Sequence, residues 1–398
     1  MTAGTGGRPV VVVGLKDRVT DVPHGTAVVR AAAGRDEVER FVARVRSGEL
    51  AGDRFTLLGR GAPASLAPAS REELIALCRP WNRGRVRPAG YNNGVDHFGW
   101  RFPGKTVVRT VPRVPPADAT VTLDGDRATV DARLTLIEAA RRLADLGKAF
   151  HVLPNYGYVG AATPFFVPVH GSGSAVSTLG DTIEAVELYD PGIDKVVTAT
   201  RGTPAFDDRM YDTAGPAVVL GLTYRVRDPL TLRAESERLD DPTADQLWDA
   251  LADRGPANVE VRKAKSADRH VTVLRHHVDE AGHAGAPRDA LGKVWDRIEE
   301  TPIARPLFHL AVRKLGYHVE LFLKRHELAT FWEHHRDLPL NKIQLRMVRA
   351  DGMPHSPVRD EDAASADLFL ARKHKRAFRA FMADKLPGVK TNPGKQSL

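Results

Sequence analysis

The chain has 398 residues, more than one ordinary hydrophobic core holds, so we expect at least two domains. Its hydrophobic fraction of 42% and charged fraction of 27% are typical of globular proteins, and no run reaches the roughly 18 apolar residues that a membrane helix needs. The single cysteine, Cys78, excludes an internal disulfide and a cysteine-based zinc cluster; with no secretory-signal pattern, the sequence predicts a cytoplasmic protein without a membrane partner.

The net charge of +8 raises the question of nucleic acid binding. The basic residues are spread along the chain, and the one dense run, Arg372–Arg376, has no stacking aromatic residues between its cations. We therefore expect no nucleic acid partner. An anionic ligand such as a dinucleotide or a phosphorylated substrate explains the surplus of positive charge equally well.

Short α/β units are expected in the first part of the chain. Residues 1–51 predict an α/β extension with strands at 9–13 and 26–30 and a helix at 34–47. A helix at 70–78 opens with a capping signal, and a second, at 134–146, ends before a glycine. The strands expected between residues 52 and 230 are 55–58, 85–88, 106–111, 120–123, 127–131, 183–189, 194–200 and 217–226.

The pattern of expected helices and strands changes after Pro229. The helices expected beyond it are 236–254, 287–300, 326–336 and 373–385. The strands expected there are 259–263, 270–275, 317–323 and 342–348. Strands dispersed among helices, with this shift near residue 230, predict an α+β protein of two domains.

Small residues recur in the first of these two parts at positions that suit a dinucleotide. The sequence R-V-R-P-A-G-Y-N-N-G at 85–94 places a glycine-rich turn after a strand, and V-H-G-S-G-S at 169–174 forms a second such loop. Successive backbone N–H groups hold a diphosphate well, and small residues permit its close approach. Taken alone, each loop is equally an ordinary turn between strands.

The order of these motifs over about 300 residues resembles the FAD-binding domain of the vanillyl-alcohol-oxidase (PCMH-type) family, with the closest likeness to alditol oxidases and sugar-lactone oxidases. The resemblance extends to K-I-Q-L-R-M-V-R-A-D-G at 342–352 and N-P-G-K at 392–395. It implies an FAD-binding domain of two subdomains at 52–230 and a substrate (cap) domain at 231–355, with an antiparallel sheet and flanking helices. A C-terminal segment, 356–398, would complete the active site.

The resemblance also implies which residues contact FAD. Asn93 stands where family members often carry the histidine that bonds to the flavin, so the FAD should be non-covalent. The stretch 166–169, F-V-P-V, replaces small and hydroxyl residues, which leaves loss of the cofactor open. The implied cofactor-binding residues are Ala89, Gly90, Tyr91, Asn92, Asn93, Gly94, Gly160, Ala161, Ala162, His170, Gly171, Ser172, Gly173, Gly221 and Leu222.

The catalytic positions implied by the resemblance are partly changed. Lys395 and Arg346 keep the cationic half of the site, whereas Gln344 stands where the family has a glutamate and cannot act as a carboxylate base. His318 and Glu320 share one face of strand 317–323, and either is a candidate for the missing base or an exposed polar residue. The alternation that places Gln344 and Arg346 on one face fits a solvent face or a ligand face.

Two functions are compatible with these residues. The first is an FAD-dependent oxidoreductase that oxidises a hydroxyl of a sugar, polyol, lactone or nucleoside-like small molecule. The alternative is a non-redox dehydratase or other lyase on the same scaffold, with FAD absent or structural, and a catalytically inactive binding protein is a third possibility. No metal site is expected, because the histidine pairs at 276–277 and 334–335 lack a chelating spacing.

Overall fold

The computed structural model describes residues 115–190, 192–212, 218–279 and 315–395 as continuous stretches. Outside them it describes positions 10–11, 27–28, 55–56, 65–66, 70–78, 86–89, 106–109, 111, 298 and 301. The predicted helices at 34–47 and, apart from position 298, at 287–300 lie outside the described residues, as do Gly90, Tyr91, Asn92, Asn93 and Gly94.

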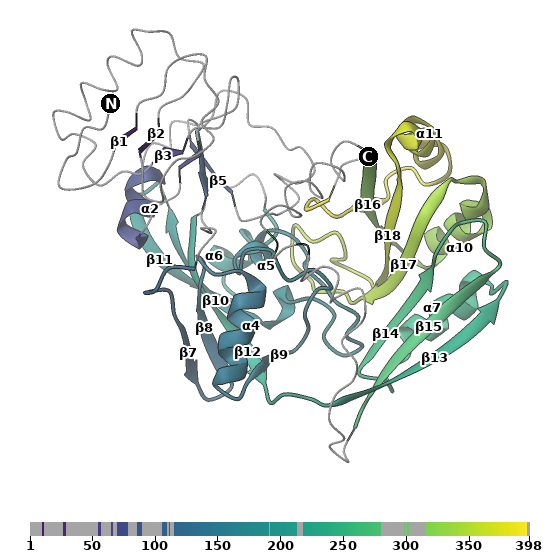
Figure 1. Ribbon diagram of the computed structural model, residues 1–398, viewed down its shortest axis with the longest axis horizontal. Helices are drawn as coiled ribbons and strands as arrows, with labels where there is room; N and C mark the ends of the chain where they lie inside the picture. Colours follow the sequence, from purple (N-terminus) through teal and green to yellow (C-terminus); the bar gives the residue numbers. More distant parts are fainter. Residues whose placement is uncertain are drawn as a thin grey trace, which may run out of the picture.

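The early elements are short. A parallel pair, β1 with β2, precedes a sheet of order β3-β4-β6-β5, beside which α2 lies (Figure 1). Their bounds are β1 Val10–Val11, β2 Ala27–Val28, β3 Phe55–Thr56, β4 Ser65–Leu66, α2 Arg71–Cys78, β5 Val86–Ala89 and β6 Thr106–Arg109. Each expected strand up to residue 111 overlaps one of these strands.

The next body is an antiparallel sheet of order β11-β10-β12-β8-β7, with β9 added beside β12. Helix α4 covers one face, held by Leu136, Ala139 and Leu143, and Gly147 ends it with φ +72°. The elements are β7 Val121–Asp124, β8 Arg127–Asp131, α4 Leu136–Asp145, β9 Ala149–Phe150, α5 Thr163–Phe166, β10 Ile183–Asp190, β11 Lys195–Thr200, α6 Pro204–Asp207 and β12 Val218–Arg227.

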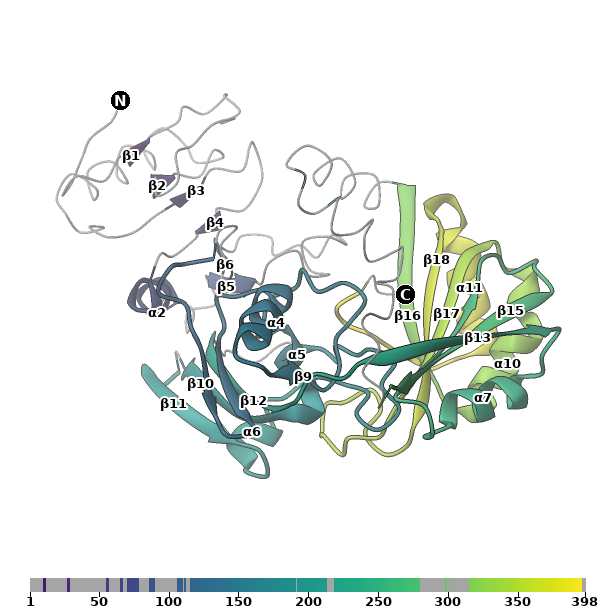
Figure 2. The ribbon, with the colours of Figure 1, turned by 60° about the horizontal axis from the view of Figure 1, so that its bottom comes forward.

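The second large body, here called the cap domain, is a seven-stranded antiparallel sheet of order β13-β15-β14-β17-β18-β16-β19. Helices α7, α10 and α11 cover the face turned away from the first body (Figure 2). The elements are β13 Leu232–Asp240, α7 Ala244–Ala252, β14 Asn258–Lys263, β15 His270–Val278, β16 Gly316–Leu323, α10 Arg325–His334, β17 Leu340–Val348, β18 Ala363–Ala371, α11 Lys375–Lys385 and β19 Lys390–Thr391.

The two faces of the cap sheet differ in chemistry because alternate residues of a strand point to opposite sides. On β16, Tyr317, Val319 and Leu321 join the apolar core under the helices, whereas His318 and Glu320 lie on the other face. Polar side chains of β17 and β18 share that second face and are buried there. Buried polar groups need partners, and neighbouring strands of the sheet, the first body and the C-terminal segment supply them.

Two expectations are corrected. The helix expected over 236–254 is split, because residues 232–240 form strand β13 along the whole of β15, and α7 begins only after Thr243, whose side chain caps it. Strand β18 lies between β17 and β16 in the cap sheet, so the segment after residue 356, expected to be separate from the cap domain, contributes to the sheet itself. Among the described residues, no helix is long and apolar enough to span a membrane.

Candidate active site at the domain interface

Six charged or titratable side chains meet where the polar face of the cap sheet contacts the first body. One comes from the loop at 169–174, four from strands β16, β17 and β18, and one from the C-terminal segment. We call this group the interdomain cluster; its members are His170, His318, Glu320, Arg346, Asp367 and Lys395.

Glu320 joins three parts of the chain. Its carboxylate is 1% exposed and accepts hydrogen bonds from His170 Nε2 at 2.6 Å, Ser365 Oγ at 2.6 Å and Asn392 Nδ2 at 2.7 Å. Burial acts to raise the pKa of Glu320, but His170 and Lys395 outweigh it and hold this pKa below its ordinary value. The carboxylate is therefore ionised at neutral pH, and His170 Nε2 donates to it.

Asp367 is the second buried carboxylate, and it is surrounded by cations. It contacts His318 Nε2 directly, and Lys342 Nζ lies 3.3 Å from its Oδ2. Lys395 Nζ and Arg346 Nη2 lie 3.9 and 3.8 Å from its oxygens. Burial acts to raise the pKa of Asp367, but the hydrogen bond from His318 and the charges of Lys395 and Lys342 hold it well below its ordinary value.

His318 is neutral in this setting. Burial lowers the pKa of His318, and Lys395 and Lys342 act in the same direction against the opposite effect of Asp367. With His318 neutral, its Nε2–H donates to the Asp367 carboxylate, and the two lysines add positive charge beside it. The cluster thus holds a neutral imidazole against an ionised carboxylate, the arrangement that suits a proton acceptor.

Lys395 is placed by the turn that precedes it. The backbone N–H of Asn392 donates to the Glu320 carbonyl at 3.0 Å, and the N–H of Lys395 donates to the Asn392 carbonyl at 3.0 Å. The ammonium group then lies 3.4 Å from His318 Nε2. The side chains of His318, Lys395 and Lys342 are 19%, 25% and 42% exposed, so this side of the cluster is open while Glu320 forms its closed end.

Gln344 and Arg346 are both buried, which makes their face of β17 an interior face and not a solvent face. Gln344 donates to the carboxylate of Glu260 on β14, which also pairs with Arg262. Arg346 instead lies between the two carboxylates of the cluster, 3.8 Å from each. Gln344 therefore belongs to a neighbouring polar contact, and Arg346 belongs to the cluster.

The small residues that the resemblance places on FAD contact the chain itself. A Cβ on Gly171 would lie 2.5 Å from the Leu153 carbonyl oxygen, and one on Gly173 would lie 2.1 Å from that of Val176. The amide of Ala161 donates to the Leu134 carbonyl. The other described members of that set also contact the chain itself, through β-pairing, through burial in the core or through a loop hydrogen bond; they are Ala89, Gly160, Ala162, Ser172, Gly221 and Leu222.

The loop before His170 leaves little room beside the cap domain. Phe165 is fully buried in the core of the first body, and a Cβ on Gly394 would lie 3.3 Å from Val167 Cγ2. Together with the direct His170–Glu320 contact, this closes the space between the loop and the cap sheet. These residues do not fit a flavin ring between His170 and Glu320, whereas the open side near His318 and Lys395 carries cations that suit an electron-rich ring or an oxyanion.

The structure brings together four of the five catalytic residues chosen from sequence. The interdomain cluster contains Lys395, Arg346, His318 and Glu320. His170, predicted to contact FAD, also belongs to the cluster and contacts Glu320. Sequence reasoning missed Asp367, Ser365 and Asn392. The alternation of β18, which puts Ser365 and Asp367 on one face, was the available signal for these two, and nothing local marked Asn392.

Comparison with known proteins locates the fold. No protein-family model matches the sequence, and no curated protein does. Among solved structures, cholesterol oxidase from Brevibacterium sterolicum and a histidine-to-alanine mutant of it superpose with a TM-score of 0.55 at 12% sequence identity. The matches cover 83% of this chain and 82–83% of those chains. The protein therefore has the two-body α+β fold of these oxidase structures.

Proposed function

We propose that this protein is an oxidoreductase that oxidises a hydroxyl group of a polar small molecule: a sugar, polyol, lactone or nucleoside-like compound. The carrying observation is the buried contact of His318 with Asp367, flanked by Lys342 and Lys395 on the open side of the interdomain cluster. The shared fold with solved oxidase structures and the resemblance of the sequence motifs to FAD-binding oxidases support the same reaction class.

Alcohol oxidation removes a hydride and a proton from the substrate; FAD, when bound non-covalently, supplies the hydride acceptor. The protein's part is to remove the proton. Because His318 Nε2 donates to Asp367, the imidazole accepts the hydroxyl proton at Nδ1, and Asp367 stabilises the imidazolium that forms. Lys395, 3.4 Å from the imidazole, steadies the substrate oxygen as negative charge develops on it.

The closed end of the cluster holds these groups in place. Glu320 fixes the Asn392 turn that carries Lys395, and Arg346 balances the two buried carboxylates. The open side presents two ammonium groups and an imidazole, and such donors suit a substrate with several hydroxyl or anionic oxygens. This chemistry supports a polar substrate.

The visible spectrum of the purified full-length protein tests the redox part. We expect absorbance near 450 nm, either as purified or after reconstitution with FAD, and bleaching of this band by a substrate under anaerobic conditions. Protein that stays colourless and takes up no FAD would overturn the assignment. Lys395→Met and Asp367→Asn should each lower kcat at least a hundredfold, while Lys385→Met, a matched change on the exposed side of α11, should leave it unchanged.

One observation favours the alternative, a dehydratase or other lyase. The glycines at 171 and 173 are closed by the chain's own backbone and leave no cradle at that loop. In that case His318 and Lys395 would carry out acid–base chemistry alone. Loss of water from a candidate substrate, without an electron acceptor and without peroxide, would select this alternative over the oxidoreductase.

A further inference from the structure

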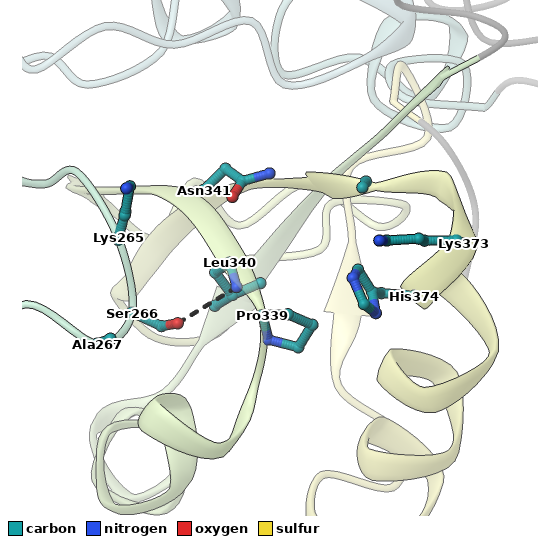
Figure 3. A pocket seen from close by; sticks show the side chains of 9 residues that line it. Lys265, Ser266, Ala267, Pro339, Leu340, Asn341, Lys373 and His374 are labelled. Atoms are coloured by element: carbon teal, nitrogen blue, oxygen red, sulfur yellow. Dashed lines mark hydrogen bonds between the residues drawn. The ribbon is translucent and has the colours of Figure 1, made fainter.

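A pocket of about 390 Å³ lies at one end of the cap sheet, where β17 begins, β18 ends and α11 starts (Figure 3). Pro339 and Leu340 supply part of its apolar wall. Its volume is within the range of small-molecule sites, about 300–1,000 Å³. None of its lining residues belongs to the interdomain cluster, so a ligand here would be additional to the substrate of the proposed function.

The lining is cationic. Lys265 lies on one wall, and Lys373 and His374 extend from the opposite wall toward the start of β17 (Figure 3). No carboxylate lines the pocket. Lys373 and His374 belong to Arg372–Arg376, the densest basic run in the sequence, which the interdomain cluster does not use.

Two backbone features shape the cationic side of the pocket. Asn341 is the extra residue of a β-bulge, since the register passes from Leu340 opposite Leu370 to Lys342 opposite Phe369, and bulges redirect side chains. Helix α11 begins at Lys375, directly after the 3₁₀ turn Arg372–His374, and the Lys375 N–H donates to the Arg372 carbonyl within that turn. The helix start therefore contributes the partial positive charge of its dipole to this wall.

We propose that this pocket binds the phosphate group of a small phosphorylated compound. Two ammonium groups on opposite walls match the two negative charges of a phosphate, and donors arriving from several directions suit its tetrahedral oxygens. The volume exceeds that of one phosphate, so the apolar wall at Pro339 and Leu340 would contact the remainder of the molecule.

Calorimetric titration of the full chain with glucose 6-phosphate, inorganic phosphate and glucose tests the proposal, and it needs no flavin. We expect saturable binding of the two phosphates and none of glucose. Equal affinity for both phosphates would overturn the contact of the apolar wall with the remainder of the molecule. Absence of saturable phosphate binding would overturn the proposal.

Variants separate a built site from general charge attraction. Lys265→Ala and Lys373→Ala should each weaken phosphate binding at least tenfold. Arg376→Ala removes the same charge from the same basic run, outside the pocket lining, and should change binding less than twofold. Equal weakening in all three variants would overturn the proposal. The unfolding midpoint of each variant checks that these exposed substitutions leave the fold intact.

Discussion

The contacts of Glu320 predict a large loss of stability when its charge is removed. In Glu320→Gln the side chain keeps its shape, but its new amide group faces hydrogen-bond donors, and Arg346 loses one of its two carboxylates. Removing one partner of a buried ion pair costs about 3–5 kcal/mol. We therefore expect the free energy of unfolding at pH 7 to fall by about 3–5 kcal/mol.

The pH dependence gives this prediction a second signature. The pKa of Glu320 is lowered in the folded protein, so its stabilising contribution is complete above the unfolded-state pKa of about 4.3 and is lost as the pH falls through the folded-state pKa. The difference in stability between wild type and Glu320→Gln should be constant between pH 6 and pH 8 and should shrink below about pH 4.

Urea unfolding followed by tryptophan fluorescence measures both effects. Glu237→Gln is the matched control, since Glu237 pairs with Arg275 at 2.7 Å but its side chain is 46% exposed. Exposed pairs contribute about 0–1 kcal/mol, so this variant should stay close to wild type. A loss in Glu320→Gln no larger than that of Glu237→Gln would refute the idea that Glu320 ties the domains and the C-terminal segment together.

Three further outcomes follow from the described contacts. In Gly171→Ala the new Cβ would lie 2.5 Å from the Leu153 carbonyl oxygen, so the free energy of unfolding measured in urea should fall by about 1–3 kcal/mol. In Gly221→Ala the nearest atom would lie 3.6 Å from the new Cβ, so this control should be tolerated. Equal effects of the two substitutions would contradict the packing argument. Burial lowers the pKa of His335 to about 4, so acidification protonates this group in the unfolded chain before the folded one. The free energy of unfolding of wild type should therefore fall by about 2 kcal/mol between pH 7 and pH 5 because of His335, and that of His335→Phe should fall correspondingly less. Since the pKa of His318 is lowered by burial, the acid limb of kcat/KM should lie below the ordinary histidine value of about 6.5, and a limb above it would argue against His318 as the base.

Local patterns in the sequence predicted most of the strands and both faces of the cap sheet. The alternation in β16 placed His318 and Glu320 on one face, and that in β17 placed Gln344 with Arg346. The signal failed in β13, where nearly every residue is exposed, so no apolar alternation marks the strand. Its existence depends on pairing with β15, which a single segment does not encode.

What only the tertiary structure decided is which polar residues meet. His170 and Glu320 are 150 residues apart, and their contact results from docking a loop of one body against a sheet of the other. The sequence alone marks His170 as part of a glycine-rich loop and leaves Glu320 equally fit for solvent. Periodicity assigns a side chain to a face because it reflects backbone geometry within one element. Burial and partners depend on what covers that face, and long-range packing decides that.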